Sequence, residues 1–238
     1  MLVTDASLHR PTVLERVRRS FDASVGSIVF GMEDGTVSIF GLVFGVAASA
    51  PDSNAVLLAG ATGAAAAAVS MMAGAYLDAE SANDQDAAKL EDVRQRIEQH
   101  SDAEDAEARA RLLGAGYSDA EAATLLELAG RHPESRVRLT AAVELGITDA
   151  TRQSPTAQAA WMFAADLVAA SIPVLPFAFF DLSTARVVSV VITVMLLVIL
   201  GVGRAAIGRR SVATTVLETL GIAAGAAVAG FAIGSLVT

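Results

Sequence analysis

The chain of 238 residues contains no cysteine. Disulfides and thiolate metal sites are therefore excluded. Its three histidines, His9, His100 and His132, lack the spacing of metal ligands. The sequence also shows no nucleophile–base pair, no phosphate-binding loop and no basic patch that would fit nucleic acid. We therefore expect neither an enzyme nor a nucleic-acid-binding protein.

Charged residues are scarce, at 18%, while 53% of the residues are hydrophobic and the mean hydropathy is +0.52. This composition is too apolar for a soluble domain and predicts an integral membrane protein. The first residues do not place an apolar core behind a basic region, so we expect no signal peptide there.

Five apolar segments are long enough to cross a bilayer, which takes about 20 residues. They cover about 25–48, 54–77, 157–180, 185–202 and 212–237. We predict an all-α polytopic membrane protein with five transmembrane helices and a cytosolic helical insert between spans two and three. The expected domains are an N-terminal amphipathic cytosolic segment (1–23), spans one and two (24–77), the insert (78–154) and spans three to five (155–238).

The net charge of −9 lies in the insert, because residues 78–150 hold 17 acidic and 8 basic side chains and the remainder is balanced. The arginines outside the insert gather on one side of the five expected spans, at Arg10–Arg19, Arg152 and Arg204–Arg210. The positive-inside rule then places the N-terminus and the insert in the cytosol and the C-terminus outside. Because no organelle address is visible, we expect the plasma membrane.

Helix signals in the insert are clear. The sequences Ser101–Glu104 and Ser118–Glu121 both read S-D-A-E, which predicts capping boxes that begin helices. Gly114 and Gly146 predict helix ends, and Pro133 interrupts the helix before it. The insert is therefore expected to form several short helices.

Three stretches carry a resemblance to a known family. They read E-D-G-T-V-S-I-F-G-L-V-F-G-V from residue 33, L-L-A-G-A-T-G-A-A-A-A-A-V-S-M-M-A-G-A-Y-L from residue 57, and L-P-F-A-F-F from residue 175. With the helical insert between them, the chain resembles the vacuolar iron transporter family, which includes nodulin-like members. The resemblance implies a homodimer in the lipid bilayer that exports ferrous iron or manganese from the cytosol in exchange for protons. Mn²⁺ or Fe²⁺ is then the transported substrate, and no tightly bound cofactor is expected.

The resemblance also implies which residues line the path of the metal. Asp34 matches the aspartate of the family's D-G motif, and Met71 matches the methionine of its S-M-x-A-G motif. A carboxylate oxygen suits Mn²⁺ or Fe²⁺, and a thioether adds a soft ligand. The glutamate that the family has before the tyrosine is replaced here by Ala75. Further candidates for the path are Glu33, Met72 and, in the third span, Asp166.

In the insert, the resemblance implies metal binding by glutamates. Glu104 and Glu107 form an i, i+3 pair on one side of a helix, and Glu144 stands in V-E-L-G-I at a liganding position. The positions of a preceding pair fall on Val93 and Arg96, which cannot bind a cation.

A second function stays open on the sequence alone. The chain could be a membrane-anchored metal-sensing or interaction module that transports nothing, in which the apolar segments only pack against one another. Ala75 and the loss of acidic residues in the insert favour this alternative.

Overall fold

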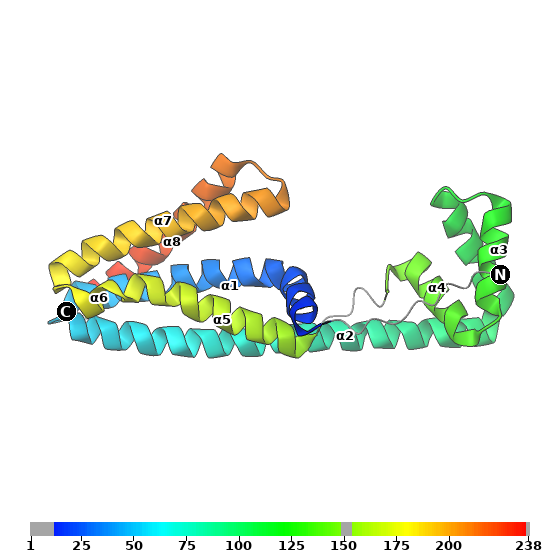
Figure 1. Ribbon diagram of the computed structural model, residues 1–238, viewed down its shortest axis with the longest axis horizontal. Helices are drawn as coiled ribbons and strands as arrows, with labels where there is room; N and C mark the ends of the chain where they lie inside the picture. The colour runs from blue at the N-terminus through cyan, green and yellow to red at the C-terminus, as the bar shows by residue number, and fades with distance from the viewer. Residues whose placement is uncertain (1–11, 149–153, 237–238) are drawn as a thin grey trace. The chain divides into compact units, whose positions relative to one another are not determined.

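The structure is a computed structural model that describes residues 12–148 and 154–236, and every regular element in these ranges is an α-helix (Figure 1). The helices are α1 (Val13–Ser49), α2 (Ser53–Gly114), α3 (Asp119–Gly130), α4 (Pro133–Leu145), α5 (Pro155–Val174), α6 (Pro176–Phe179), α7 (Leu182–Gly208) and α8 (Val212–Leu236). Helices α1, α2, α5, α7 and α8 are long and apolar enough to cross a membrane. The predicted all-α fold with five spans is confirmed.

The chain divides into two compact units. The membrane unit comprises Met1–Tyr76 and Thr156–Thr238, and the insert unit comprises Leu77–Pro155. Helix α2 contributes its first part to the membrane unit and its remainder to the insert unit. The insert unit differs from the expected insert, 78–154, by one residue at each end.

Helix α1 begins with a capping box that the sequence analysis missed. Glu15 N donates to Thr12 Oγ1 (3.2 Å), and Thr12 N donates to a Glu15 carboxylate oxygen (2.8 Å). The expected amphipathic segment and the first span form one helix, and no proline occurs between Val13 and Ser49 to interrupt it. Arg10 and His9 lie outside the described residues.

Helices α1 and α8 meet along four glycines, Gly41, Gly45, Gly230 and Gly234, which we call the glycine seam. A Cβ added at Gly45 would lie 2.6 Å from the carbonyl oxygen of Gly230, and one added at Gly230 would lie 2.1 Å from that of Gly41. The two backbones therefore touch with no room for a side chain, as small-xxx-small spacing allows.

The membrane unit also contains an apolar core. Its buried members come from α1, α2, α5, α6 and α7 and include Ile39, Val43, Val56, Val174, Phe177 and Ala185. The expected third span is split at Leu175 into α5 and α6, since Pro176 has no N–H to continue the helix. Ser189 of α7 donates to the carbonyl of Pro173 (2.7 Å), which satisfies a backbone acceptor beside the break.

The insert unit follows its predicted helix boundaries. Helix α2 is interrupted at His100 (φ −140°, ψ 46°) and resumes at the first S-D-A-E sequence. The second forms the predicted capping box, with Ser118 N donating to Glu121 (2.8 Å). Gly146 ends α4 in the left-handed conformation (φ 70°). The core of this unit is small and consists of Val93, Ile97, Val137 and Ala141, with Leu90 against them.

Candidate metal path and carboxylates of the insert

Asp34 lies in α1 on the wall of a pocket of about 490 Å³ within the membrane unit. The same pocket is lined by Phe30, Glu33, Arg204 and Ile222. The Asp34 side chain is half-buried, and no hydrogen bond or ion pair joins it to another residue that the structure describes. An uncompensated carboxylate in a membrane-spanning helix is a functional candidate, because holding it there costs about 2.5 kcal/mol or more.

Asp166 of α5 is fully buried, with 0% of its surface exposed. Neither of its carboxylate oxygens has a hydrogen-bond partner among the described residues. The carboxylate packs on α1 at Gly35, where an added Cβ would lie 2.6 Å from Asp166 Oδ1. The negative charge of Asp34, next to Gly35 in the chain, acts on Asp166. The structure therefore brings together two of the carboxylates that the sequence analysis proposed separately.

Met162 lies one helical turn before Asp166 and faces α1 in the same way. An added Cβ at Gly31 would lie 2.6 Å from the thioether sulfur of Met162, and the residue is only 6% exposed. This methionine was not among the residues predicted from the sequence to line the path. Its signal was the i, i+4 spacing from Asp166, which puts both side chains on one helix face.

Glu33 has a different environment from its neighbour Asp34. Arg204 of α7 donates to both carboxylate oxygens of Glu33 (3.0 and 3.2 Å), and the hydroxyl of Thr219 in α8 donates to one of them (2.8 Å). Glu33 thus joins α1 to the other two helices. A carboxylate with this many donors is a weaker candidate for a metal ligand than one with none.

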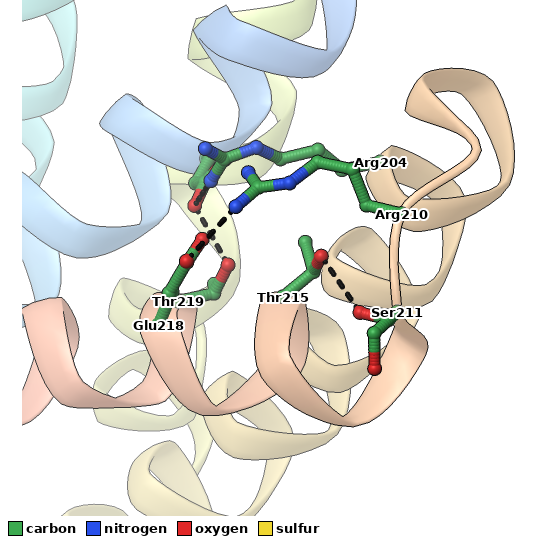
Figure 2. Close-up of polar contacts among 7 residues, drawn as sticks. Arg204, Arg210, Ser211, Thr215, Glu218 and Thr219 are labelled. Carbon is green, nitrogen blue, oxygen red and sulfur yellow. Dashed lines mark hydrogen bonds and ion pairs between the residues drawn. The ribbon is translucent and has the colours of Figure 1, made fainter.

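A second ion pair stands where α7 passes into α8. Arg210 donates to Glu218 (2.9 Å), and the hydroxyl of Thr215 donates to the carbonyl of Ser211 (3.0 Å), as Figure 2 shows. Arg204 and Arg210 thus pair with Glu33 and Glu218, and no such ion pair joins Asp34 or Asp166 to another described residue.

The part of α2 that belongs to the membrane unit supplies thioethers and no carboxylate. Met71 and Met72 are both half-buried, and no aspartate or glutamate occurs between Ser53 and Tyr76. Ala75 is buried, with 8% of its surface exposed. The carboxylate that the resemblance implies on this helix is therefore absent, and the position is filled by a packed methyl group.

In the insert unit, Arg96 occupies the space between two of the proposed ligands. Its guanidinium contacts Glu104 (Nε to Oε1, 3.1 Å) and Glu144 (Nη2 to Oε2, 2.5 Å). The two glutamate side chains are only 12% and 15% exposed. One guanidinium thus joins the segments of α2 before and after His100 to α4.

Glu107, the third proposed ligand in the insert unit, pairs with Arg111 (2.7 Å). The hydrogen bond from Arg111 holds the pKa of Glu107 below its ordinary value, and the charge of Arg96 contributes in the same direction. Arg111 also lies within 3.5 Å of the backbone carbonyl of Glu144. All three glutamates therefore have arginine partners in this structure.

No group of three or more His, Asp or Glu side chains within residues 12–148 and 154–236 is arranged to hold a metal ion. The groups in the membrane unit that could contact a metal ion are carboxylates, thioether sulfur and backbone oxygen.

Comparisons with known proteins agree with the fold. Residues 25–235 match the model of a family described as the VIT family. The chain is 28% identical over 214 residues to vacuolar iron transporter 1 of Eucalyptus grandis, covering 90% of this chain and 86% of that protein. It is equally similar to vacuolar iron transporter 1 of Arabidopsis thaliana, with the same coverage. The vacuolar iron transporter of Centaurea cyanus is 28% identical over 209 residues, covering 87% of this chain and 85% of that protein.

Proposed function

Because the chain belongs to the VIT family, we propose that it transports a divalent metal ion, Mn²⁺ or Fe²⁺, across a membrane through its membrane unit. The relatives named above are called iron transporters, and they match this chain over most of its length. The five candidate spans supply the membrane-crossing part that such a function requires. The transported ion is the substrate, and the proposal includes no bound cofactor.

The observation that carries the proposal is Asp34. It is an intramembrane carboxylate on the wall of a pocket, without an arginine partner in the described part of the chain. Carboxylate oxygen is a suitable ligand for Mn²⁺ and Fe²⁺. Met71 of α2 is the proposed soft ligand of the same path, with Met72 beside it.

The resemblance implies export from the cytosol, and the distribution of charge supports this direction. Arg16, Arg18 and Arg19 begin α1, and Arg204, Arg209 and Arg210 end α7 and enter α8. The positive-inside rule puts these ends in the cytosol together with the acidic insert unit. Arg152, which the sequence places on the same side, lies outside the described residues. An acidic cytosolic unit raises the local concentration of cations on the side from which metal is exported.

Two finer parts of the proposal come from the resemblance alone: exchange of metal for protons, and assembly as a homodimer. The relatives are named for the vacuole, so they lend no support to the expected plasma membrane. Integral membrane location is supported by the spans themselves.

The test is uptake of Mn²⁺ and Fe²⁺ by liposomes that contain the purified protein. Asp34→Asn should abolish uptake, since it removes the charge and keeps the shape of the side chain. The matched variant is Glu33→Gln, one residue away, which should keep uptake and lower thermal stability because Arg204 loses its partner. Equal uptake by the wild type and Asp34→Asn would contradict the proposal.

The sensing or interaction module is the alternative that the same experiment separates. Ala75 and the arginine partners of Glu104, Glu107 and Glu144 favour it. A folded wild-type protein that moves neither ion would support this module over a transporter.

A further inference from the structure

Helix α5 presents a thioether and a carboxylate to two glycines of α1. Met162 and Asp166 are one turn apart on α5, and Gly31 and Gly35 are one turn apart on α1. At each glycine an added Cβ would come within 2.6 Å of the facing side-chain atom, Sδ or Oδ1. The missing Cβ atoms thus leave the room that these two polar or polarisable groups occupy.

The Asp166 carboxylate lies in a setting that a purely structural role does not explain. It is 0% exposed, and both of its oxygens are without a hydrogen bond from any described residue. Burying a carboxylate without a partner costs several kcal/mol in proteins. The nearby charge of Asp34 adds repulsion to that cost. A cation between or beside the two carboxylates would remove both penalties.

The other acidic residues near this contact, in contrast to Asp166, have arginine partners. Glu33 is held by Arg204 and Thr219, and Glu218 is held by Arg210. Helix α2 has no carboxylate in its membrane portion, and α7 has none between Leu182 and Gly208. Asp34 and Asp166 are therefore the described in-span carboxylates without an arginine partner, and Asp166 packs on Gly35, the residue next to Asp34 in the chain.

We infer that Asp166 and Met162 of α5 are ligands of the transported ion and complete, with Asp34 of α1, its binding point inside the membrane unit. This inference rests on the proposed transport function and extends it to a second helix. Two carboxylates balance the charge of one divalent ion, and the thioether is a soft ligand that favours Fe²⁺ over Mn²⁺. The second carboxylate, for which α2 offers only Ala75, is supplied by α5.

The test compares the wild type with Asp166→Asn, Asp34→Asn and Met162→Leu, all as full-length protein in detergent and in liposomes. Mn²⁺ binding in detergent is measured by the loss of the free-ion paramagnetic resonance signal, and uptake is measured for both ions. Asp166→Asn should weaken Mn²⁺ binding and slow uptake by about 10-fold to 100-fold. Met162→Leu conserves volume and should reduce Fe²⁺ uptake more than Mn²⁺ uptake.

Thr193→Val is the matched control. The hydroxyl of Thr193 in α7 is also buried without a partner among the described residues, so the variant removes a comparable polar group from a different helix. It should leave binding and uptake unchanged. Size-exclusion chromatography and thermal melting check that each variant is folded.

The outcomes separate the inference from the function on which it rests. If Asp34→Asn abolishes uptake while folded Asp166→Asn binds and transports normally, the inference is overturned and the transport function stands. If the wild type transports neither ion, the transport function fails; unaltered Mn²⁺ binding in Asp166→Asn then overturns the inference as well. Should Asp166→Asn fail to fold, Met162→Leu decides, and an unchanged ratio of Fe²⁺ to Mn²⁺ uptake counts against the inference.

Discussion

The membrane unit and the insert unit differ in the partners of their candidate metal-binding carboxylates. In the insert unit, Glu104, Glu107 and Glu144 are all paired with arginines. In the membrane unit, where an unpaired charge costs far more, Asp34 and Asp166 have no such partner in the described chain. The carboxylates without an arginine partner thus lie in the membrane unit, where burying an unpaired charge costs the most free energy. This pattern is expected of a site whose partner is the substrate.

The helices within each unit are also held together by different kinds of contact. The membrane unit relies on close backbone contact at the glycine seam and on an apolar core from five helices. The insert unit has a core of four buried residues and links its helices through guanidinium groups. Arg136, for example, reaches from α4 to Asp105 and to the backbone carbonyl of Ser101. Close packing therefore stabilises the membrane unit, and ion pairs contribute much of the stability of the insert unit.

The largest effect is expected from adding one methyl group to the glycine seam. Gly230→Ala places a Cβ 2.1 Å from the carbonyl oxygen of Gly41, so α1 and α8 must separate. We expect a loss of about 3 kcal/mol in the free energy of unfolding, measured in mixed micelles. Gly225→Ala is the control in the same helix, because nothing lies within 4 Å of its added Cβ. Equal stability of the two variants would contradict the claim that close backbone contact at the glycine seam stabilises the membrane unit.

A smaller effect is expected from removing the guanidinium of the insert unit. Arg96→Gln leaves the nearly buried carboxylates of Glu104 and Glu144 without their partner, and it should destabilise the contact of α4 with α2 by about 2 kcal/mol. Faster hydrogen exchange of α4 in the intact protein measures the loss. Arg131→Gln removes an exposed pair with Glu127 (62% and 74% exposed) and should cost less than about 0.5 kcal/mol. If the two variants exchange alike, charge does not hold this unit together.

The smallest effect concerns a helix cap. Asp181 precedes α7 and accepts hydrogen bonds from Ser183 (2.5 Å) and from the hydroxyl and N–H of Thr184 (2.8 and 3.2 Å), which lower its pKa to about 2. Since the folded-state pKa lies below the unfolded value of about 3.9, the cap stabilises the protein above pH 4 and loses this effect as the pH falls toward 2. Asp181→Ala should therefore lower the melting temperature slightly at pH 7.

A carboxylate cap with the same direction of pKa shift occurs in the insert unit. The pKa of Glu121, which caps α3 in the insert unit, is lowered in the same direction by hydrogen bonds from Ser118. Carboxylate caps thus behave alike in both units, whereas the candidate metal-binding carboxylates do not. A difference between wild type and Asp181→Ala that stays constant from pH 7 to pH 2 would show that the carboxylate charge does not stabilise the cap.

Most of the fold could be predicted from the sequence, since hydropathy marks the spans and local signals mark the helix ends. Ser118, Pro133 and Gly146 all act through their own backbone or that of near neighbours. The continuity of α1 was not predicted because hydropathy marks only its apolar part, and the charged stretch with Arg16, Arg18 and Arg19 was expected to form a segment of its own.

The candidate site was only partly predictable, because its contacts join residues far apart in the chain. Asp34 and Asp166 each stood out as in-span carboxylates, but their proximity depends on which face of α5 meets Gly35. Hydrophobic periodicity predicts which face of a helix is buried, but it does not predict which other helix packs against that face. For the same reason the partner of Glu33, 171 residues away at Arg204, could not be inferred from spacing.

The buried carboxylate of α5 has a consequence for how the protein is made. In its most apolar window α5 has a mean hydropathy of 1.3, the lowest value among the five spans. An aspartate near the centre of a nascent span opposes its insertion by about 2.5–3.5 kcal/mol. Helix α1, which offers Gly31 and Gly35 to this face, is synthesised first. During biogenesis, α5 is therefore the span that most needs an earlier helix waiting in the bilayer before it can leave the translocon.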